Sequence, residues 1–346
     1  MSDDGWMLFE QIRSGGCLSY LIGCEASRAA ILVDPHLGQV DRYLALAVER
    51  GVRVHHVVET HTHADHFSGA NELARRLDAR VVMHRLSAAP FASVRVDDGE
   101  SLLVGKLDVR MLHTPGHTED SMCIVVEDRV LTGDTLLIGG TGRTDLPTGD
   151  PEALYDSLWG KLLALDDAMK VYPAPDYKER TATTIGAERA SNPRLQATER
   201  GAFVALMHGL DLKMPDHLTE ALRTNRSGGK TVAQLIAEAS RQISFMGMAE
   251  VRARIERGNQ LLLLDVREKD AFDAGHLPGA MHISRGQLEL RVDKAFPDPS
   301  VRVLVYCQFG KISTLAAATL RSMGFNRAVA LDGGFDAWLK AGYPTA

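Results

Sequence analysis

The sequence has few cysteines, no long apolar run and no excess of positive charge, and each absence excludes a class of protein. Four cysteines among 346 residues are too few for a disulfide framework. No apolar run approaches the roughly 18 residues that span a bilayer, so we expect no membrane partner. The formal net charge of −6 gives no electrostatic reason to expect a nucleic-acid partner.

The remaining composition is that of a globular protein with room for two domains. Hydrophobic residues make up 45% of the chain and charged residues 24%, which is typical of soluble proteins. The length allows two cores of ordinary size. Residues 1–4 are acidic and lack the basic-then-apolar layout of a signal peptide, so we expect a cytoplasmic location.

Apolar runs and turn signals predict an α/β organisation in both parts of the chain. Residues 225–230 are polar and glycine-rich and form the best linker. We expect a first domain over residues 1–242, in which 180–230 form a helical extension and linker, and a second domain over 243–346. Strands are expected over residues 18–22, 30–33, 54–59, 80–84, 107–112, 121–126, 129–132, 261–266, 301–306 and 328–331, and helices over 40–50, 71–77, 198–210, 231–240, 312–323 and 334–341.

Residues that bind metals are concentrated in residues 61–66, directly after a predicted strand. Three histidines and an aspartate within six residues can converge on a cation from a single loop. His117, in a turn after a strand, and Asp134, at a strand end, supply further ligands of the same kinds. The isolated histidines His84, His208 and His217 are interpreted as ordinary core or surface residues.

The pattern H-x-H-x-D-H resembles the motif of the metallo-β-lactamase superfamily, and the likeness covers about the first 180 residues. The resemblance implies an αββα sandwich with metals at one edge of its two sheets. Hydrolases of this superfamily such as glyoxalase II hold two metals, and a bridging hydroxide attacks the acyl carbon. Their second metal needs a histidine where this chain has Pro175, which has no metal-binding side chain. This departure weakens the hydrolase interpretation.

The sequence Gly-Arg-Thr-Asp over residues 142–145 resembles the persulfide dioxygenases, the family of the ethylmalonic encephalopathy protein. Such enzymes hold one Fe(II) per chain through two histidines and one carboxylate, which leaves positions open for O₂ and substrate. Carried over by position, the resemblance implies that His61, His117 and Asp134 hold the iron. The residues that would orient these ligands through hydrogen bonds are His63, Asp65 and His66.

Two further residues are candidate substrate contacts in this family. Arg143 can pair bidentately with a glutathione carboxylate, and a structural ion pair with an acid such as Asp145 is the alternative. Tyr177 can place a hydroxyl near an iron-bound substrate, and a buried tyrosine with other partners is the alternative.

Cys307 lies between a predicted buried strand and a predicted helix. A loop in that place aims backbone N–H groups at the sulfur, and the helix N-terminus adds positive potential. Both effects lower a thiol pKa, so we expect a nucleophilic thiolate, with an inert buried cysteine as the alternative. The loop that would hold the thiolate comprises Gln308, Phe309, Gly310, Lys311, Ile312 and Ser313. By contrast, Cys17, Cys24 and Cys123 lie in strand-like settings and are predicted to be small buried hydrophobic residues.

From about residue 246 the chain resembles a single rhodanese module, on the motifs at 264–268, 275–280 and 331–338. The resemblance implies a three-layer α/β/α domain in which Cys307 accepts a sulfane sulfur and passes it to a thiol. Thiosulfate-using rhodaneses often have arginines in this loop, where this chain has Gln308 and Ile312 and keeps only Lys311 as a cation. The donor and acceptor preference is therefore open.

Together the two resemblances imply a sulfur-metabolism enzyme of the persulfide dioxygenase–rhodanese fusion type. Its iron domain would oxidise glutathione persulfide with O₂ to sulfite and glutathione. Its rhodanese domain would interconvert thiosulfate plus glutathione with glutathione persulfide plus sulfite. The alternatives are a glyoxalase II-type zinc thioesterase fused to a rhodanese, and a persulfide carrier or redox sensor with a vestigial metal fold. A homodimer is a further expectation.

Overall fold

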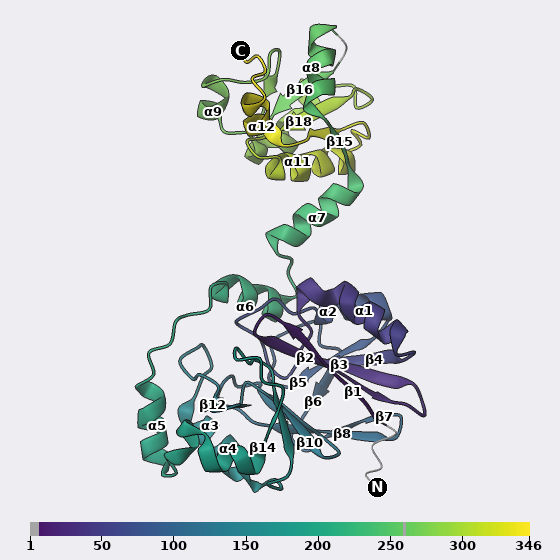
Figure 1. Cartoon of the computed structure of the whole chain (residues 1–346). Helices are drawn as coiled ribbons and strands as arrows, with labels where there is room; N and C mark the ends of the chain where they lie inside the picture. Colours follow the sequence, from purple (N-terminus) through teal and green to yellow (C-terminus); the bar gives the residue numbers. More distant parts are fainter. Residues whose placement is uncertain (1–6, 259–260) are drawn as a thin grey trace. The chain divides into compact units, whose positions relative to one another are not determined.

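The computed structural model describes residues 7–258 and 261–346, and the chain divides into two compact units (Figure 1). The first unit ends at Gly229 and the second begins at Lys230. This division precedes the expected boundary at 242/243, because helix α7 (Val232–Gln242) packs on α11 (Lys311–Ser322) of the second unit. Residues 225–227, expected in the linker, instead belong to helix α6 (Leu218–Ser227), which ends at Gly228 in the left-handed conformation.

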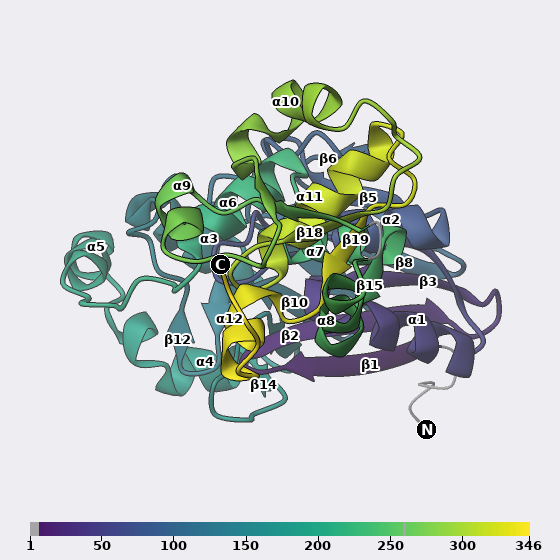
Figure 2. The same cartoon turned by 90° about the horizontal axis from the view of Figure 1, so that it is seen from above.

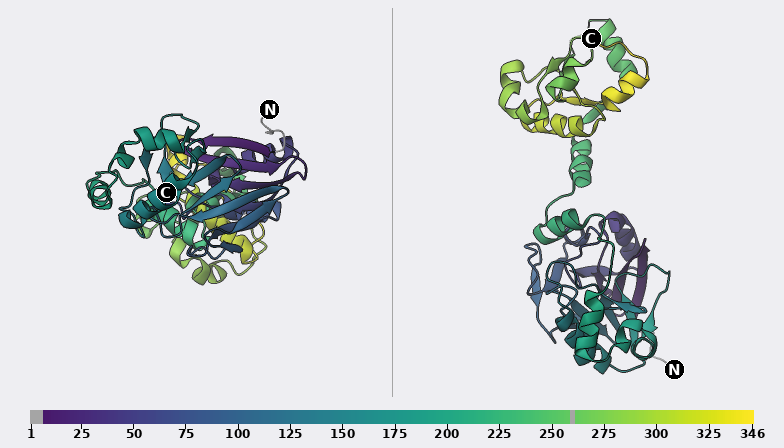
Figure 3. Two further views of the ribbon diagram at one scale, coloured as in Figure 1. Left: turned by 90° about the horizontal axis from the view of Figure 1, so that it is seen from below. Right: turned by 90° about the vertical axis from the view of Figure 1, so that its left-hand side faces the viewer.

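Two six-stranded sheets form the centre of the first unit, with strand orders β1-β2-β3-β4-β5-β6 and β14-β13-β10-β9-β8-β7. Figures 2 and 3 show these strands side by side. The first sheet comprises β1 (Met7–Ser14), β2 (Cys17–Cys24), β3 (Ala29–Val33), β4 (Arg53–Val58), β5 (Arg80–His84) and β6 (Val94–Val96). The second comprises β7 (Ser101–Val104), β8 (Leu107–His113), β9 (Met122–Val126), β10 (Arg129–Gly133), β13 (Lys170–Pro173) and β14 (Thr183–Thr184), and β11 (Leu136–Leu137) pairs separately with β12 (Gly140–Thr141).

The layers of the first unit follow from which faces of its strands are apolar. In β8 the apolar residues Leu107, Val109 and Met111 alternate with exposed polar ones, so only one face enters the core. Strands β2 and β3 are buried along almost their whole length, because one face meets the other sheet and the opposite face meets helices. The covering helices are α1 (Val40–Glu49) and α2 (Ala70–Leu77) on the first sheet, and α3 (Pro151–Gly160), α4 (Ile185–Ser191) and α5 (Arg200–His208) on the second. The expected αββα sandwich is confirmed.

The second unit has one parallel five-stranded sheet, in the order β15-β19-β18-β16-β17, and separate apolar clusters cover its two faces. The expected three-layer α/β/α arrangement is therefore confirmed. Its strands are β15 (Ser244–Met246), β16 (Leu262–Asp265), β17 (Met281–His282), β18 (Val303–Tyr306) and β19 (Val329–Leu331). Its helices besides α7 and α11 are α8 (Met248–Glu256), α9 (Lys269–Asp273), α10 (Leu288–Ala295) and α12 (Gly334–Lys340).

Strand ends position the loops that carry the ligand-type residues of the first unit. The 61–66 loop follows β4, the turn that ends at His117 follows β8, and Asp134 directly follows β10. Gly116 fixes the second of these segments at φ +132°, where an added Cβ would lie 2.3 Å from the backbone of Leu154 in α3. Only glycine therefore lets the His117 turn approach α3 this closely. Among the described residues, no helix has the length and apolar character to cross a bilayer.

His84, at the end of β5, is a core residue as expected, and its environment gives it a pH dependence. Its ring stacks on His113 with centroids 3.8 Å apart, and burial together with that neighbour lowers its pKa to about 4. The folded protein therefore keeps His84 neutral in a pH range where the unfolded chain protonates it. Stability from this residue is present above the ordinary histidine pKa of about 6.5 and is lost as the pH falls toward 4.

We predict that His84→Phe reduces this acid destabilisation, because phenylalanine keeps the ring stack and cannot be protonated. Between pH 7 and pH 4 the wild-type protein should lose up to about 3 kcal/mol more stability than the variant. Urea unfolding of metal-free protein across this range measures the difference. The exposed His208 provides the control, since His208→Phe should follow the wild-type pH profile. Parallel profiles for wild type and His84→Phe would contradict the prediction.

Candidate functional site

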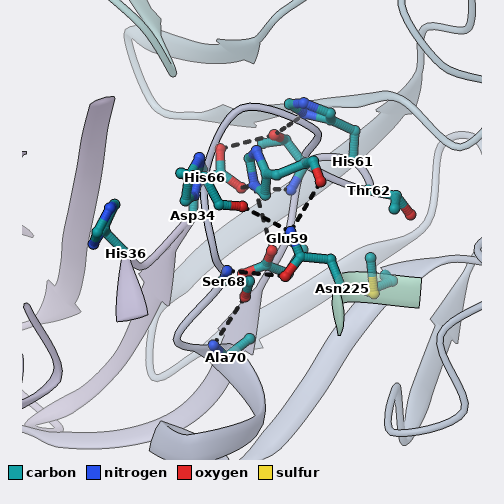
Figure 4. Close-up of polar contacts among 12 residues, drawn as sticks. Asp34, His36, Glu59, His61, Thr62, His66, Ser68, Ala70 and Asn225 are labelled. Atoms are coloured by element: carbon teal, nitrogen blue, oxygen red, sulfur yellow. Dashed lines mark hydrogen bonds and ion pairs between the residues drawn. The ribbon is translucent and has the colours of Figure 1, made fainter. Parts of the chain in front are cut away.

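The loop between β4 and α2 buries its three histidines, His61, His63 and His66. Figure 4 shows His61 and His66 together with Asp34, which follows β3, and Asn225 of α6. The described residues contain three groups whose ligand atoms lie within 4.8 Å of one another: His61 with His117 and Asp134, Asp34 with Glu59 and His63, and Cys17 with Asp65 and His66.

The first group is the one that the sequence assigned to iron. Nε2 of His61 lies 3.9 Å from Oδ1 of Asp134, and Nε2 of His117 lies 3.6 Å from Oδ2 of the same carboxylate. Burial lowers the pKa of His61 well below its usual range, with the neighbouring histidines adding to the effect. Burial also raises the pKa of Asp134 to about 6. A neutral imidazole is the form that binds a metal, and a bound cation would hold Asp134 as a carboxylate.

Hydrogen bonds fix which ring nitrogen of each histidine faces this group. Nδ1 of His117 lies 2.8 Å from the carbonyl oxygen of Arg143, so Nδ1 donates and Nε2 keeps its lone pair. Nδ1 of His61 lies 3.0 Å from the hydroxyl of Thr60, which itself donates to Oδ2 of Asp34 at 2.7 Å. The Thr60 oxygen is therefore the acceptor toward His61, and Nε2 of His61 is again free to bind a metal. Two imidazoles and a carboxylate in this arrangement fit Fe(II).

Asp34, Glu59 and His63 form a second group, farther inside the protein. Nε2 of His63 lies 3.2 Å from Asp34 and 3.3 Å from Glu59. Burial opposes a charge on His63, yet the two carboxylates raise its pKa. Burial raises the pKa of Glu59 to about 7. Nε2 of His63 therefore faces two acids, while its ring lies against that of His61 with centroids 4.1 Å apart, which is compatible with the supporting role expected of it.

Cys17 requires a correction, because it is not the inert core residue that the sequence suggested. Cys24 and Cys123 are buried as predicted, whereas Cys17 is half-buried. Its Sγ lies 3.8 Å from Oδ2 of Asp65, and it belongs to the third group of ligand atoms. The strand-like pattern around Cys17 could not show that the first residue of β2 lies beside the 61–66 loop.

A cavity of about 580 Å³ opens onto Asp65, His117 and Asp134. One wall comes from the segment between α5 and α6, including Lys213 and His217, and His217 is exposed, as expected of a surface residue. Arg194, which the sequence gave no role, also lines the cavity and donates to the carbonyl oxygen of Thr141 at 2.6 Å. The other residues that line it include Arg143, Pro175 and Tyr177.

The two predicted substrate contacts both line this cavity. Arg143 makes the ion pair with Asp145 that was left as an alternative, through two contacts of 2.6 Å, and also donates to the carbonyl oxygen of Lys213 at 2.7 Å. Tyr177 is 74% exposed, so the alternative of a buried tyrosine is wrong. An added Cβ on Gly16 would lie 2.2 Å from the Tyr177 ring, which shows how closely this ring covers the turn between β1 and β2.

The loop after β18 holds Cys307, which is buried. The backbone N–H of Ser313 donates to its Sγ at 3.2 Å, and Gly310 turns the chain at φ +83° into helix α11. Phe309 is 67% and Ile312 50% exposed, and Lys311 is also exposed, so these side chains surround the loop on its solvent side. Cys307 is thus a buried cysteine with polar contacts at the start of α11, and its role as a nucleophile stays a prediction.

The residues behind the Cys307 loop include an arginine that sequence reasoning missed. Arg267 is buried, pairs with Asp265 at 2.6 Å, and donates to the side-chain oxygen of Gln308 at 3.3 Å. Backbone N–H groups of Phe335 and Asp336 donate to the carbonyl oxygens of Cys307 and Gln308, each at 2.9 Å. The spacing of Asp265 and Arg267 directly after a strand was the signal that could have identified this support.

Comparisons with known proteins agree with both units. Residues 12–177 match the model of the metallo-beta-lactamase superfamily, and residues 248–341 match that of the rhodanese-like domain. The chain is 38% identical to the mitochondrial persulfide dioxygenase ETHE1 of Bos taurus over 214 residues, which are 61% of this chain and 84% of the relative.

One solved structure and one further relative bear on the choice between dioxygenase and hydrolase. The crystal structure of ETHE1 from Myxococcus xanthus is 42% identical, has a TM-score of 0.63, and covers 65% of this chain and 100% of that one. A hydroxyacylglutathione hydrolase of Anaeromyxobacter dehalogenans is 39% identical over 173 residues, 49% of this chain and 66% of that protein. Because the likeness to ETHE1 extends over more of both chains, the chain belongs to the persulfide dioxygenase family of the metallo-β-lactamase superfamily and carries a C-terminal rhodanese-like domain.

Proposed function

We propose that this protein is an iron-dependent persulfide dioxygenase that also transfers sulfane sulfur through Cys307. The observation that carries the first activity is the group of His61, His117 and Asp134, in which each histidine has its Nδ1 engaged and its Nε2 free. Two histidines and a carboxylate would hold one Fe(II) per chain, which when bound supplies redox chemistry with O₂. Persulfide dioxygenase relatives support this assignment.

The proposed reaction converts glutathione persulfide, O₂ and water into glutathione, sulfite and two protons. The sulfane sulfur is oxidised, O₂ is reduced, and the S–S bond breaks. The protein contributes mainly by binding and orientation. Thr60 and the carbonyl oxygen of Arg143 hold the histidine rings, and the cavity beside them admits the substrate.

Glutathione carries carboxylates, and the cavity presents cations that could bind them. Arg194 lines the cavity and is half-buried, and Arg143 and Lys213 also line the cavity. Arg143 is already bonded to Asp145, so a glutathione carboxylate would have to share or replace that partner. Tyr177, exposed at the cavity, is proposed to contact the substrate through its hydroxyl.

The second proposed activity is sulfur transfer between thiosulfate and glutathione. The Cys307 thiolate attacks the outer sulfur of thiosulfate, the S–S bond of thiosulfate breaks, and sulfite leaves with the bonding electrons. A glutathione thiolate then attacks the outer sulfur of the Cys307 persulfide and leaves as glutathione persulfide. The N–H of Ser313 and the N-terminus of α11 stabilise the sulfur anion, and exposed Lys311 attracts anionic donors. Cytoplasmic location and a homodimer stay predictions.

We predict that the two activities can be removed separately. His117→Ala should abolish O₂ uptake with glutathione persulfide and lower bound iron toward zero, because a ligand is lost, while sulfur transfer from thiosulfate continues. Cys307→Ser should lower sulfur transfer by roughly a hundredfold or more and leave O₂ uptake intact. An oxygen electrode and a sulfite assay measure the two reactions.

The alternatives give different results in the same experiment. No O₂ uptake by iron-loaded wild type would contradict the dioxygenase. Hydrolysis of S-lactoylglutathione by protein with two zinc ions would instead favour the thioesterase. Loss of O₂ uptake in Cys307→Ser would favour the carrier or sensor hypothesis.

Asn225 is proposed to position the 61–66 loop. Its amide nitrogen donates to the carbonyl oxygens of His63 and His66 at 2.9 and 2.8 Å, and its amide oxygen accepts from the N–H of Ser68 at 3.0 Å. The Asn225 side chain is buried. If it were removed, water could not reach the three backbone groups to replace its hydrogen bonds. The helix that the sequence assigned to an extension thus holds the loop by three hydrogen bonds.

We predict that Asn225→Ala weakens iron binding roughly 10- to 100-fold, as loss of a residue that orients metal ligands usually does. It should also lower the free energy of unfolding by about 3 kcal/mol, because three buried backbone groups lose their partner. Competition with a chelator measures the iron affinity. The control is Thr224→Val on the same helix, because the Thr224 hydroxyl donates to the helix carbonyl oxygens of Glu220 and Ala221. Equal iron affinity in the two variants would contradict the positioning role.

A further inference from the structure

We infer that the first unit has a separate ligand site, a cavity near the start of β4 that binds a small organic anion. The cavity has a volume of about 420 Å³, within the range typical of small-molecule sites. Its walls come from the first residues of β4 and β5 and from β7, whereas the 61–66 loop follows the other end of β4. None of its lining residues lines the cavity beside His117 and Asp134, so the inference does not rest on the proposed dioxygenase activity.

An irregularity in β4 brings two consecutive histidines into this cavity. Val54 pairs with Ala30 of β3. The next residue of β3, Ile31, pairs with His56 and skips His55, which is therefore the extra residue of a β-bulge. Successive side chains of a regular strand point to opposite faces of the sheet. The bulge breaks this alternation, and both His55 and His56 line the cavity.

Arg80 gives the cavity a positive charge. Its guanidinium donates to Nε2 of His56 at 3.2 Å, and within residues 7–258 and 261–346 it forms no ion pair with an acid. Burial lowers the pKa of His56, and the neighbouring Arg80 and His55 lower it further. The folded protein therefore disfavours any additional positive charge at this point, and an anion would balance the charge already there.

The hydrogen bond from Arg80 also determines the tautomer of His56. Because a guanidinium can only donate, Nε2 of His56 accepts and the proton of the neutral ring lies on Nδ1. This Nδ1 is buried and has no hydrogen-bond partner in the part of the chain that the structure describes. A buried donor without an acceptor is destabilising. An anionic oxygen bound against His56 would supply the acceptor that the chain does not.

The other walls indicate what is attached to the anionic group. Leu103 is 76% exposed, and together with Val104 and Ala29 it forms an apolar wall. An inorganic oxyanion would leave this wall unused. Asp78, which ends α2, places a carboxylate in the same cavity, where it repels a second anionic group and can accept a hydrogen bond. The ligand is therefore a monoanion with an apolar body and a hydroxyl or amine hydrogen.

Anilinonaphthalene sulfonate has these properties, and its fluorescence rises when it leaves water, so titration of the full-length protein with this dye tests the inference. We expect a binding component that Arg80→Gln weakens roughly tenfold or more, because a charge-assisted contact is lost. Asp78→Asn should tighten it severalfold, since a repulsive charge is removed and asparagine tolerates the left-handed conformation at φ +52°. The matched control is Arg76→Gln on α2, which removes an exposed arginine outside the cavity and should leave the affinity unchanged.

Dye bound elsewhere on the protein would not respond to these substitutions. Equal affinities in the wild type, Arg80→Gln and Asp78→Asn would therefore overturn the inference, as would the absence of dye binding.

A second measurement needs no variant. Diethyl pyrocarbonate modifies accessible histidines, and peptide mass spectrometry gives the rate at each one. Dye at about ten times its Kd should slow the modification of His55 about tenfold by mass action. Modification of His208, which is exposed and lies outside the cavity, should keep its rate. Equal rates at His55 with and without dye would contradict binding in this cavity.

Discussion

The buried carboxylate of Asp34 is the contact on which the metal loop depends. It accepts hydrogen bonds from the N–H and the hydroxyl of Thr60, each at 2.7 Å, and it lies 3.2 Å from Nε2 of His63. Through Thr60 it determines which nitrogen of His61 faces Asp134. Its own N–H donates to Val58 at 2.9 Å, so the ends of β3 and β4 are joined at this residue. A carboxylate this deeply buried is tolerated because Thr60 and His63 supply polar partners to both of its oxygens.

Burying several acids and histidines side by side lowers the stability of the folded protein. The packing of the surrounding sheets and loops offsets this loss. Burial raises the pKa of Asp134 and of Glu59, which means that the folded protein resists holding them charged. Two β-sheets and the amide of Asn225 nevertheless keep these groups together. Strain of this kind is typical of sites whose charges a cation is meant to balance.

The sequence predicted the strands and helices that have a strong pattern of apolar residues. It also predicted the metal-binding residues that lie close together in the chain. β5 was predicted to the residue, and the ligand-type residues of the 61–66 loop were identified from their spacing alone. Helix α3 was missed, although Asp150 caps it and Pro151 opens it, and these two local signals are enough to predict a helix start. Asn225 was placed in a linker, since its contacts are to residues about 160 positions away and no local pattern encodes them.

Cys17 and Pro175 show most clearly what a linear pattern cannot contain. In the sequence, Cys17 is a cysteine in an apolar strand, and Pro175 is a proline where the hydrolases have a ligand histidine. Only the structure reveals that the two residues are bridge partners and that Cys17 lies beside Asp65. A metal site depends on the set of donors around a point and not on the segment that supplies each one.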